Sequence, residues 1–519
     1  MSAGGRVRVA IRCDAAAEIG GGHAMRCLTL ANALSEAGAT VTFVAAAMPE
    51  AIAERIRLAG HALRRIPASA ELRREGEKWE EPPLGAEAQL ADARATAEAI
   101  GEADWLVVDH YLLDPRWHSA ARGFADRILV IDDLANRPYD CDILLDQTFG
   151  RSPDDYRELT PESAKILAGA IYALLRPEFA RERPAALERR QEGGPVRRIL
   201  VSMGTTDPGG LTGRIVGQIL SAAPQCAIDV VLGSQATSLD EVRALATRHP
   251  AVSVHVDSDR MAELMRDADF AIGAAGSTSW ERCCLALPAI VLPVADNQRL
   301  GAENLERAGA VLLADSPADV ATLLKGLEDR LRISMIAAAA AITDGNGTQM
   351  VVDAVSGGKL FGQDQLELRG AVSDDSRTVW LWRNDFTTRR FSQTSDPIGW
   401  RDHVRWWQST LKSADRHLLI AELAGTAVAM VRFDLSDEGG FEVSINLAPS
   451  ARGSGLGGRI LAKACNKFRA VHDGARLLAT VHPENPPSRA IFQKLGFVRS
   501  GALLNSGFER YELAEGTVE

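Results

Sequence analysis

Residues 7–34 read VRVAIRCDAAAEIGGGHAMRCLTLANAL, and this run contains the pattern of one repeating unit of the N-terminal region. The stretch from Val7 to Cys13 predicts a strand, and apolar residues spaced three apart from Met25 to Leu34 predict a helix. The glycine loop at residues 20–22 lies between them. A strand, a glycine loop and a helix in this order are typical of a parallel α/β sheet.

The same alternation continues beyond this unit. Further strands are predicted at residues 40–45, 105–109, 128–132 and 143–145, with helical stretches between several of them. After a polar stretch at 181–196, a second series of strands is predicted at residues 198–203, 228–232, 252–256, 270–273 and 289–294, followed by a helix through 335–342. We therefore expect two Rossmann-like α/β domains, at residues 1–180 and 195–355.

A third domain is expected at residues 365–519, after a glycine-containing linker at 356–364. The composition changes there, because five of the nine tryptophans lie between residues 380 and 407. No basic stripe accompanies these tryptophans, so a small core or the wall of an acceptor pocket is favoured over a nucleic-acid stacking platform.

The composition of the 519 residues limits the partners. Asp and Glu number 69 against 58 Lys and Arg, a net charge of −11, which offers no electrostatic surface for nucleic acid. The seven cysteines are scattered and lack CxxC spacing, which favours reduced thiols over disulfides or zinc. No apolar run is long enough to cross a membrane. We expect a cytoplasmic protein with no membrane or nucleic-acid partner.

The loop before the first helix is a candidate anion site, because free amides and the helix dipole at Gly22 favour a phosphate. The alternative is a tight turn. The same dipole disfavours a protonated imidazole at His23, which suits a general base. Asp132-Asp133 suggests a metal pair, but a strand-end loop is favoured, and no metal is expected.

The second expected Rossmann-like domain has small and hydroxyl-bearing residues directly after a strand, at Gly273-Ala-Ala-Gly276-Ser-Thr-Ser-Trp-Glu281. This pattern allows two interpretations. One is a diphosphate site, and the other is a capping box in which Glu281 caps a helix that begins near Thr278. Asn297 and Gln298 follow the next strand, at the edge where open α/β sheets bind ligands.

Six segments together resemble the UDP-sugar hydrolase family of pseudaminic acid biosynthesis, over residues 6–355. They are IRCDAAAEIGGGHAMRCLTLANAL (11–34), VVDHY (107–111), IDDLANRPYDCDILLDQ (131–147), YALLRPEF (172–179), GTTDPGG (204–210) and GAAGSTSWERCCLALPAIVLPVADNQ (273–298). The resemblance implies a GT-B-type glycosyltransferase fold and hydrolysis of UDP-2,4-diacetamido-2,4,6-trideoxy-β-L-altropyranose to UDP and the free sugar.

The same resemblance assigns roles to individual residues. It implies that His23 activates water for attack at the anomeric carbon, and that Glu281 binds the ribose hydroxyls. The diphosphate is assigned to Gly276, Ser277 and Thr278. The sugar side is assigned to Asp14, Asp109, Tyr111, Asn297 and Gln298. No metal is required, because backbone amides can take up the charge of the leaving group.

The third domain contains a second glycine loop, Arg452-Gly-Ser-Gly-Leu-Gly-Gly458, between a predicted strand at 442–449 and a helix ending near Arg469. Its glycine spacing also fits a dinucleotide fingerprint. The next strand, at 477–481, lacks the acidic residue that should hold a ribose, so NAD is disfavoured.

This loop and the downstream segment NPPSRAIFQKLGF (485–497) resemble the GCN5-related N-acetyltransferase (GNAT) family over residues 370–515. The resemblance implies a GNAT α/β fold and acetyl-CoA as co-substrate. Its implied cofactor-binding residues are Leu447, Arg452, Gly453, Ser454, Gly455, Leu456, Gly457, Gly458, Asn485, Ser488 and Phe492. Phe492 replaces a tyrosine that can protonate the departing thiolate in many members. Glu442 is a candidate base or an exposed strand residue.

Together the two resemblances imply a bifunctional enzyme of nonulosonic acid synthesis, which acetylates the 4-amine of a UDP-linked amino sugar and then releases UDP. One alternative is a GT-B glycosyltransferase that acts on a UDP-sugar. In another, the third domain only senses acetyl-CoA, or the chain scaffolds the assembly of a surface glycan.

Overall fold

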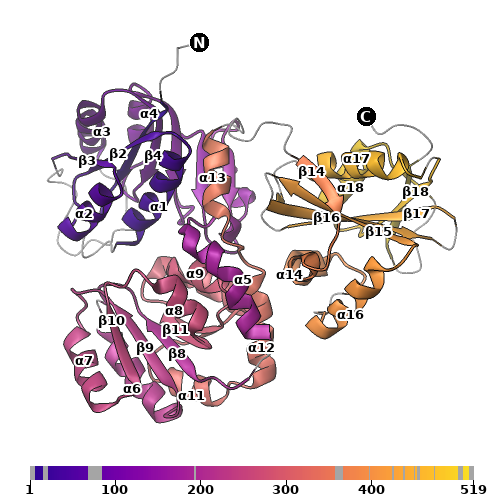
Figure 1. Cartoon of the computed structure of the whole chain (residues 1–519). Coiled ribbons are helices and arrows are strands. Elements are labelled where there is room, and N and C mark those ends of the chain that lie inside the picture. The colour runs from indigo at the N-terminus through magenta and orange to yellow at the C-terminus, as the bar shows by residue number, and fades with distance from the viewer. Residues whose placement is uncertain are drawn as a thin grey trace. The chain divides into compact units, whose positions relative to one another are not determined.

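The computed structural model describes residues 6–15, 21–67, 85–191, 194–207, 209–356, 366–394, 396, 398–423, 426–436, 439–448, 451–452, 456–472, 474–500 and 507–513. The chain divides into two compact units, Met1–Gly357 and Gly358–Glu519 (Figure 1). The expected class is confirmed, because the first unit contains two Rossmann-like parallel sheets and the second contains one mixed sheet.

The first sheet of unit 1 is parallel throughout and has the order β3-β2-β1-β4-β5-β6-β7. The strand order reverses between β1 and β4, so the carboxyl ends of these two strands form a topological switch point, where such sheets bind ligands. The strands are β1 (Arg8–Cys13), β2 (Thr40–Ala45), β3 (Ala62–Arg65), β4 (Ala103–Asp109), β5 (Ala125–Ile131), β6 (Ile143–Asp146) and β7 (Lys165–Ala168). The helices are α1 (Gly22–Glu36), α2 (Glu50–Leu58), α3 (Ala86–Ile100), α4 (Pro115–Ala121), η2 (Pro153–Asp155) and η3 (Ala170–Tyr172).

The second sheet of unit 1 is also parallel, with the order β10-β9-β8-β11-β12-β13. Its strands are β8 (Arg198–Ser202), β9 (Ala227–Leu232), β10 (Val252–Val256), β11 (Phe270–Ala274), β12 (Ala289–Leu292) and β13 (Val311–Leu313). Its helices are α6 (Leu211–Ala222), α7 (Leu239–Arg248), α8 (Met261–Asp267), α9 (Thr278–Cys284), η4 (Asp296–Gln298), α10 (Arg299–Arg307), α11 (Asp319–Lys325) and α12 (Asp329–Ala340).

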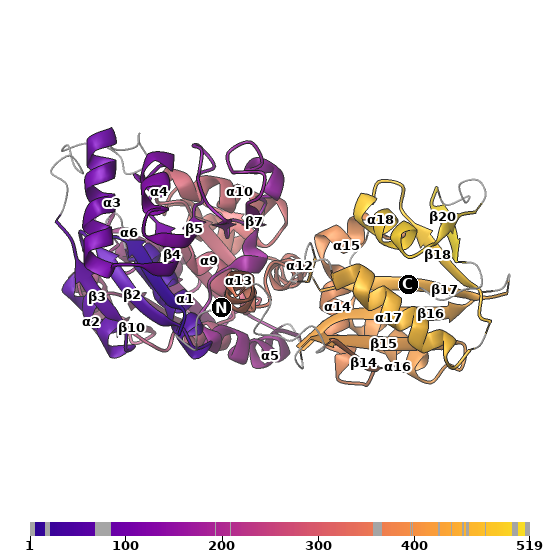
Figure 2. The same cartoon turned by 90° about the horizontal axis from the view of Figure 1, so that it is seen from above.

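Two further helices join the halves of unit 1 (Figure 2). The polar stretch predicted as a boundary forms most of α5 (Pro177–Gln191), whose Phe179 is buried in the core beside the second sheet. The last helix, α13 (Gly347–Val355), returns to the first sheet, where Val351 and Val352 are buried in the core that α1 covers. The chain therefore crosses twice between the two halves.

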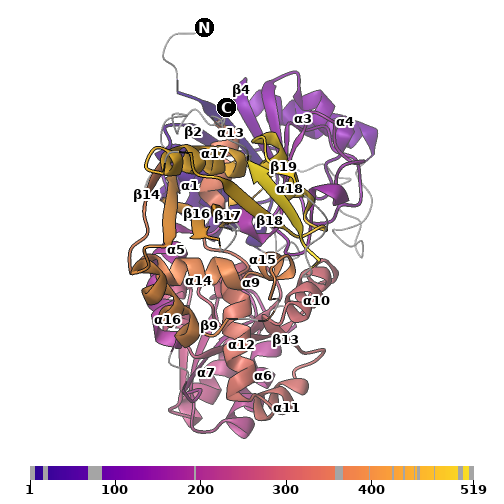
Figure 3. The same cartoon turned by 90° about the vertical axis from the view of Figure 1, so that its right-hand side faces the viewer.

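The sheet of unit 2 has the order β14-β15-β16-β17-β18-β20-β19 and is antiparallel except for the pair β17–β18. Helices α17 and α18 cover one face, and α14 and α16 cover the other (Figure 3). The strands are β14 (Leu366–Gly370), β15 (Arg416–Leu423), β16 (Thr426–Leu435), β17 (Phe441–Leu447), β18 (Leu477–Val481), β19 (Val498–Arg499) and β20 (Glu509–Leu513). The helices are α14 (Asp375–Asn384), α15 (Phe386–Arg390), α16 (Trp400–Leu411), α17 (Leu456–Arg469) and α18 (Pro486–Lys494).

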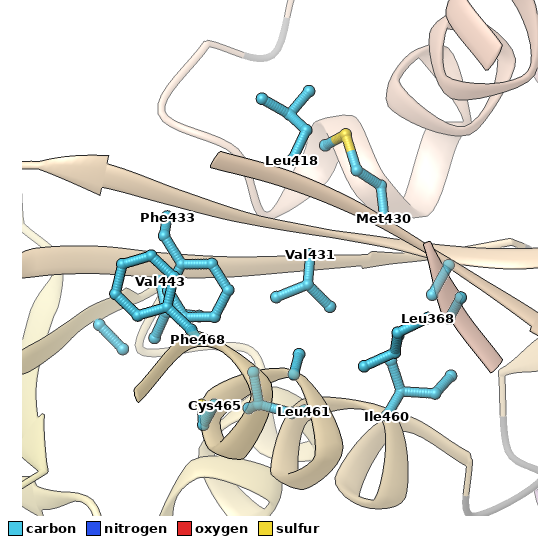
Figure 4. Packing of buried hydrophobic residues seen from close by; sticks show 14 of the residues in the cluster. Leu368, Leu418, Met430, Val431, Phe433, Val443, Ile460, Leu461, Cys465 and Phe468 are labelled. Atoms are coloured by element: carbon cyan, nitrogen blue, oxygen red, sulfur yellow. The ribbon is translucent and has the colours of Figure 1, made fainter. Parts of the chain in front are cut away.

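Alternate side chains of β16 point to opposite faces of this sheet. Val431 and Phe433 face α17, whereas Met430 lies on the other face (Figure 4). Phe433 stacks on Phe468 of α17 with ring centroids 4.1 Å apart. Burying an aromatic or aliphatic side chain of this size stabilises the fold by roughly 1.5–3 kcal/mol. Trp407 is also buried in this core.

All seven cysteines are buried and unpaired. Within the part of the chain that the structure describes, none of the helices combines the length and the apolar character needed to span a bilayer.

Candidate functional site

The first candidate site lies at the start of α1, where His23 meets the carboxyl end of β4. Nδ1 of His23 lies 2.6 Å from Oδ1 of Asp109. A carboxylate only accepts hydrogen bonds, so Nδ1 carries the proton in this contact, and in the neutral ring Nε2 is then the acceptor. The His23 side chain is 12% exposed, and its ring meets that of Tyr111 edge-on at 4.8 Å. These contacts hold the imidazole in one tautomer and one orientation, as a general base requires.

Asp109 is in turn held by Arg26. Nε and Nη2 of Arg26 donate to Oδ2 and Oδ1 of Asp109, each at 2.6 Å. Burial raises the pKa of Asp109, but Arg26 and then His23 outweigh it and keep that pKa well below its ordinary value. Because protein groups occupy both of its oxygens, Asp109 is placed to orient His23, and its contact with the sugar stays a prediction.

Asp14 is buried at the end of β1. Oδ1 accepts hydrogen bonds from Arg12 Nη1 at 2.7 Å and from the backbone of Ala46 at 2.8 Å, and Oδ2 lies 3.1 Å from Nε2 of His110. Burial raises the pKa of Asp14, but Arg12 and His110 outweigh it and lower that pKa. Asp14 therefore fixes the loops after β1 and β2, and its sugar contact also stays a prediction.

Tyr111 and Asn297 join the two sheets of unit 1. The Tyr111 hydroxyl donates to Oδ1 of Asp133 at 2.7 Å and accepts from Nδ2 of Asn297 at 3.1 Å. Tyr111 follows β4 and Asn297 follows β12, so the carboxyl edges of both sheets, where such folds bind ligands, meet here. Oδ1 of Asn297 is buried without a partner in the described residues. It is therefore an acceptor that a ligand can use.

The residues predicted to bind the diphosphate lie beside this junction. A Cβ atom on Gly276 would lie 3.5 Å from Nε2 of Gln298. Oε1 of Gln298 accepts a hydrogen bond from the backbone of Val294 at 3.0 Å, which holds the loop after β12. Ser277 is exposed and Thr278 is half-buried. The structure thus brings the predicted diphosphate loop and the predicted sugar loop into contact.

The capping-box interpretation of this segment is wrong. Ser277, not Thr278, is the N-cap residue of α9, and it makes no side-chain capping hydrogen bond. Oε1 of Glu281 instead lies 3.8 Å from Nη2 of Arg176, with a fifth of the Glu281 side chain exposed. Burial raises the pKa of Glu281 to about 7, although Arg176 lowers it. The carboxyl group is therefore not used by the helix, and its contact with ribose stays a prediction.

Asp132 and Asp133 turn toward different partners. Oδ2 of Asp132 accepts hydrogen bonds from two backbone N–H groups of the following loop, whereas Oδ1 of Asp133 accepts one from the Tyr111 hydroxyl. Behind them, the Tyr156 hydroxyl donates to Oδ2 of Asp146 at 2.8 Å, and burial raises the pKa of Asp146 to about 7. In the described ranges, no three His, Cys, Asp or Glu side chains are grouped as metal ligands.

The second candidate site lies where β17 and β18 separate. Within their described residues, the two strands pair only at Phe441–Leu477 and Glu442–Leu478. The opposite edge of β17 pairs with β16 along its whole length. The β18-facing edge of β17 beyond Glu442 therefore has backbone groups for an extended amide chain, such as the pantetheine arm of acetyl-CoA.

The start of α17 fits the same ligand. Three predicted cofactor residues lie outside the described residues: Gly453, Ser454 and Gly455. The helix begins at Leu456. A Cβ atom on Gly457 would lie 2.8 Å from Cδ1 of Ile491 and 3.1 Å from Cδ1 of Leu447, so glycine lets the helix approach β17 closely. A Cβ atom on Gly458 would meet open space.

Arg452 and Asn485 both make hydrogen bonds within unit 2. Nη1 of Arg452 donates to Oδ2 of Asp385 at 2.6 Å, and Nη2 donates to Oγ1 of Thr388 at 2.8 Å. Oδ1 of Asn485 accepts from the backbone of Ser488 at 3.2 Å and caps α18. Arg452 thus binds side chains at the start of α15 and Asn485 caps α18, and their contacts with the cofactor stay predictions.

Phe492 lies in the core of unit 2. It is 3% exposed and packs edge-on against Phe497, with centroids 5.0 Å apart. Its contact with the cofactor arm also stays a prediction. Glu442 is half-buried and stands opposite Asp434 on β16.

The contacts that Arg26 and Asp133 make in this site were not predicted from the sequence. Arg26 lies three residues after His23 on the same helix, a spacing that puts the two side chains on one face and could have indicated their association. Asp133 reaches Tyr111 across 22 positions of sequence, and no local pattern indicates that contact.

Two family models match parts of the chain. A glycosyltransferase family 28 C-terminal domain matches residues 224–346. An acetyltransferase (GNAT) domain matches residues 365–498. The chain thus combines a glycosyltransferase-like region with a region similar to acetyltransferases.

Three similar proteins of known sequence or structure share 17% to 28% identity with the chain. The chain is 23% identical over 428 residues to an uncharacterised protein of Methanocaldococcus jannaschii, covering 80% of this chain and 81% of that protein. It is 28% identical over 176 residues to the UDP-2,4-diacetamido-2,4,6-trideoxy-beta-L-altropyranose hydrolase of Campylobacter jejuni, covering 33% of this chain and 60% of that enzyme. The crystal structure of MurG from Acinetobacter baumannii matches with a TM-score of 0.48 and 17% identity, covering 68% of this chain and 100% of MurG.

Proposed function

We propose that the chain is a bifunctional enzyme of nonulosonic acid synthesis. Unit 2 transfers an acetyl group from acetyl-CoA to the 4-amine of a UDP-linked amino sugar. Unit 1 then hydrolyses the product, UDP-2,4-diacetamido-2,4,6-trideoxy-β-L-altropyranose, to UDP and the free sugar. The buried, unpaired cysteines support a reducing compartment, and we place both reactions in the cytoplasm.

The observation that carries the hydrolase proposal is the 2.6 Å contact between His23 and Asp109. Nε2 of His23 takes a proton from water as the water oxygen attacks the anomeric carbon. The bond between that carbon and the diphosphate oxygen breaks, and UDP leaves with the electron pair. Backbone amides and hydroxyls near Gly276, Ser277 and Thr278 stabilise the charge on the leaving diphosphate.

The position of His23 near both sheet edges supports this role. His23 contacts Tyr111, and Tyr111 contacts Asn297 of the second half. A UDP-sugar whose nucleotide lies against Glu281 would present its sugar near this junction. The similarity to the Campylobacter jejuni hydrolase supports water as the acceptor.

Acetyl transfer is proposed for the edge of β17. Acetyl-CoA supplies the acetyl group. The amine nitrogen attacks its carbonyl carbon, the carbon–sulfur bond breaks, and the CoA sulfur leaves with the electron pair and takes up the proton that the amine loses. The β17 edge beyond Glu442 aligns the pantetheine arm, and the start of α17, with Gly458 beside open space, receives the pyrophosphate. The match to the acetyltransferase domain supports this assignment.

The test is mass-spectrometric product analysis of the full chain with the UDP-linked 4-amino sugar and acetyl-CoA. We expect the acetylated UDP-sugar first, then UDP and the free diacetamido sugar. In His23→Ala, hydrolysis should fall by about 10²- to 10⁴-fold, with UDP binding changed by less than about tenfold. The exposed His249→Ala serves as control. Unchanged hydrolysis in His23→Ala would exclude His23 as the base.

The glycosyltransferase family 28 match favours one alternative, transfer of the sugar to an acceptor in place of water. The same Nε2 of His23 would then deprotonate an acceptor hydroxyl. Formation of a glycoside in the presence of candidate sugar acceptors, at a rate above that of hydrolysis, would favour this alternative.

A further inference from the structure

Unit 2 carries two neighbouring arginines on the sheet face that α17 does not cover. Met430 of β16 points away from α17 (Figure 4). Arg432 lies two residues further along the same strand, so its side chain is on the same face of the sheet, and it stands opposite Ser444 of β17. Its guanidinium lies over the ring of Trp406 in α16, at 5.7 Å. Arg383 of α14 is linked to the same region by hydrogen bonds: it donates to Oγ of Ser392, and that hydroxyl donates to the backbone carbonyl of Thr388 at 2.6 Å. Burial and then the charge of Arg432 also lower the pKa of Arg383. We call Arg383 and Arg432 the arginine pair.

The positive charge of the arginine pair is only partly balanced. Nε of Arg432 lies 2.8 Å from Oδ2 of Asp434, which also faces Arg416 at 3.7 Å. Arg383 has no carboxylate within 4 Å in the part of unit 2 that the structure describes, and it donates to Oγ of Ser392. An excess of half-buried guanidinium groups is costly unless an anion completes the site.

A third donor lies on the same face of the sheet. Asn446 follows Ser444 by two residues on β17, so its side chain shares a face with Arg432. Oδ1 of Asn446 lies 3.4 Å from Oγ1 of Thr388, which donates to it. Nδ2 of Asn446 is buried and has no partner among the described residues. The group therefore offers two guanidinium ions and one unused amide donor.

We propose that Arg383, Arg432 and Asn446 bind the diphosphate of a nucleotide-linked acceptor. Planar guanidinium groups match phosphate oxygens in pairs, and a buried amide N–H adds a directed bond. Asn446 lies on the part of β17 that has separated from β18, so an anion held here would keep the attached amino sugar close to the thioester. This inference rests on the proposed acetyl transfer and specifies how unit 2 recognises its acceptor.

The first experiment does not depend on either activity. The full chain is treated with phenylglyoxal, which modifies arginine, with and without UDP, and modification is quantified for each arginine peptide by mass spectrometry. We expect UDP to slow modification of Arg383 and Arg432 at least about fivefold, and to leave the exposed Arg405 of α16 unchanged. Equal modification of Arg383 and Arg432 with and without UDP overturns the inference. Protection in a chain that acetylates no amino sugar would refute the proposed function but not the anion site.

Kinetics distinguish this anion from the phosphates of the cofactor. Arg383→Gln should raise KM for the UDP-linked amino sugar by about 10- to 100-fold, the usual worth of a charge-assisted hydrogen bond. The KM for acetyl-CoA and kcat/KM for the amino sugar without UDP should stay within about twofold, and Arg383→Lys should recover part of the loss. Arg405→Gln is the control. A raised KM for acetyl-CoA, or equal losses with both sugars, contradicts the proposal.

Discussion

Nδ2 of Asn297 donates a hydrogen bond of 3.1 Å to the hydroxyl of Tyr111, across 186 positions of sequence. The bond links the loop after β12 to the loop after β4, and the same hydroxyl donates to Asp133. Tyr111 also packs against the ring of His23. The base proposed for hydrolysis and the loop of the second half are thus connected through one phenol.

Tyr111→Phe should therefore lower kcat/KM for hydrolysis by about tenfold, because it removes both hydrogen bonds and leaves the ring in place. Tyr139→Phe is a matched control, since the buried Tyr139 hydroxyl has no partner among the described residues. Steady-state hydrolysis of the acetylated UDP-sugar by both variants measures the effect. Equal activities of the two variants would show that the bridge between the halves does not contribute.

Glu281 should make UDP binding depend on pH. Its pKa is raised to about 7 by burial, so the carboxylate that can accept ribose hydroxyls forms as the pH rises through 7. The UDP affinity of the wild type should therefore rise by up to about tenfold more than that of Glu281→Gln between pH 6 and 8. Isothermal titration calorimetry measures the UDP affinity of both proteins at each pH. Protonation of UDP itself affects both proteins equally, so it cancels in the comparison. Parallel pH profiles would argue against a ribose contact.

Asp146 should reduce stability at neutral pH. Its pKa is raised to about 7 by burial, above the ordinary value near 3.8, so the folded state binds the proton more tightly than the unfolded state. Stability is then lost as the pH rises from about 4 to 7, by an amount on the order of a few kcal/mol.

Asp146→Asn should accordingly gain in thermal midpoint relative to the wild type as the pH is raised from 5 to 8. The exposed Asp154→Asn is the control. A difference between Asp146→Asn and wild type that does not vary with pH would contradict this sign.

Gly457→Ala should impair acetyl transfer, because its Cβ atom would meet side chains of Ile491 and Leu447 and push α17 away from β17. Gly370→Ala in β14 is the control, since a Cβ atom there meets open space. We expect at least about a tenfold higher KM for acetyl-CoA in Gly457→Ala only. Hydrolysis of the acetylated UDP-sugar should be unchanged in both, and its loss in Gly457→Ala would mean that the units depend on each other.

Much of the fold can be predicted from local pattern. The strands at 40–45, 252–256 and 477–481 have the predicted bounds, because each is a short run rich in β-branched and apolar residues. β3 and β13 were missed, because β3 is largely exposed and ends in two arginines and β13 has only three residues. The return of α13 to the first sheet depends on contacts with α1, which no local pattern encodes.

The candidate site follows the same division. His23 and Gly276 could be found because a strand, a glycine loop and a helix place them at a ligand edge. The capping-box ambiguity at Glu281 could not be resolved, because both interpretations need the same residues at the same spacing. The partners of Asp109 lie on α1, and those of Tyr111 follow β5 and β12, so their roles required the folded structure.

The central claim is that unit 1 releases UDP by attack of water at the anomeric carbon. The most direct test is to run the reaction of the acetylated UDP-sugar in ¹⁸O-labelled water and to measure the mass of the UDP formed. We expect unlabelled UDP, because the bond between the anomeric carbon and the diphosphate oxygen is broken. UDP that carries ¹⁸O would show attack at phosphorus and would contradict the role given to His23.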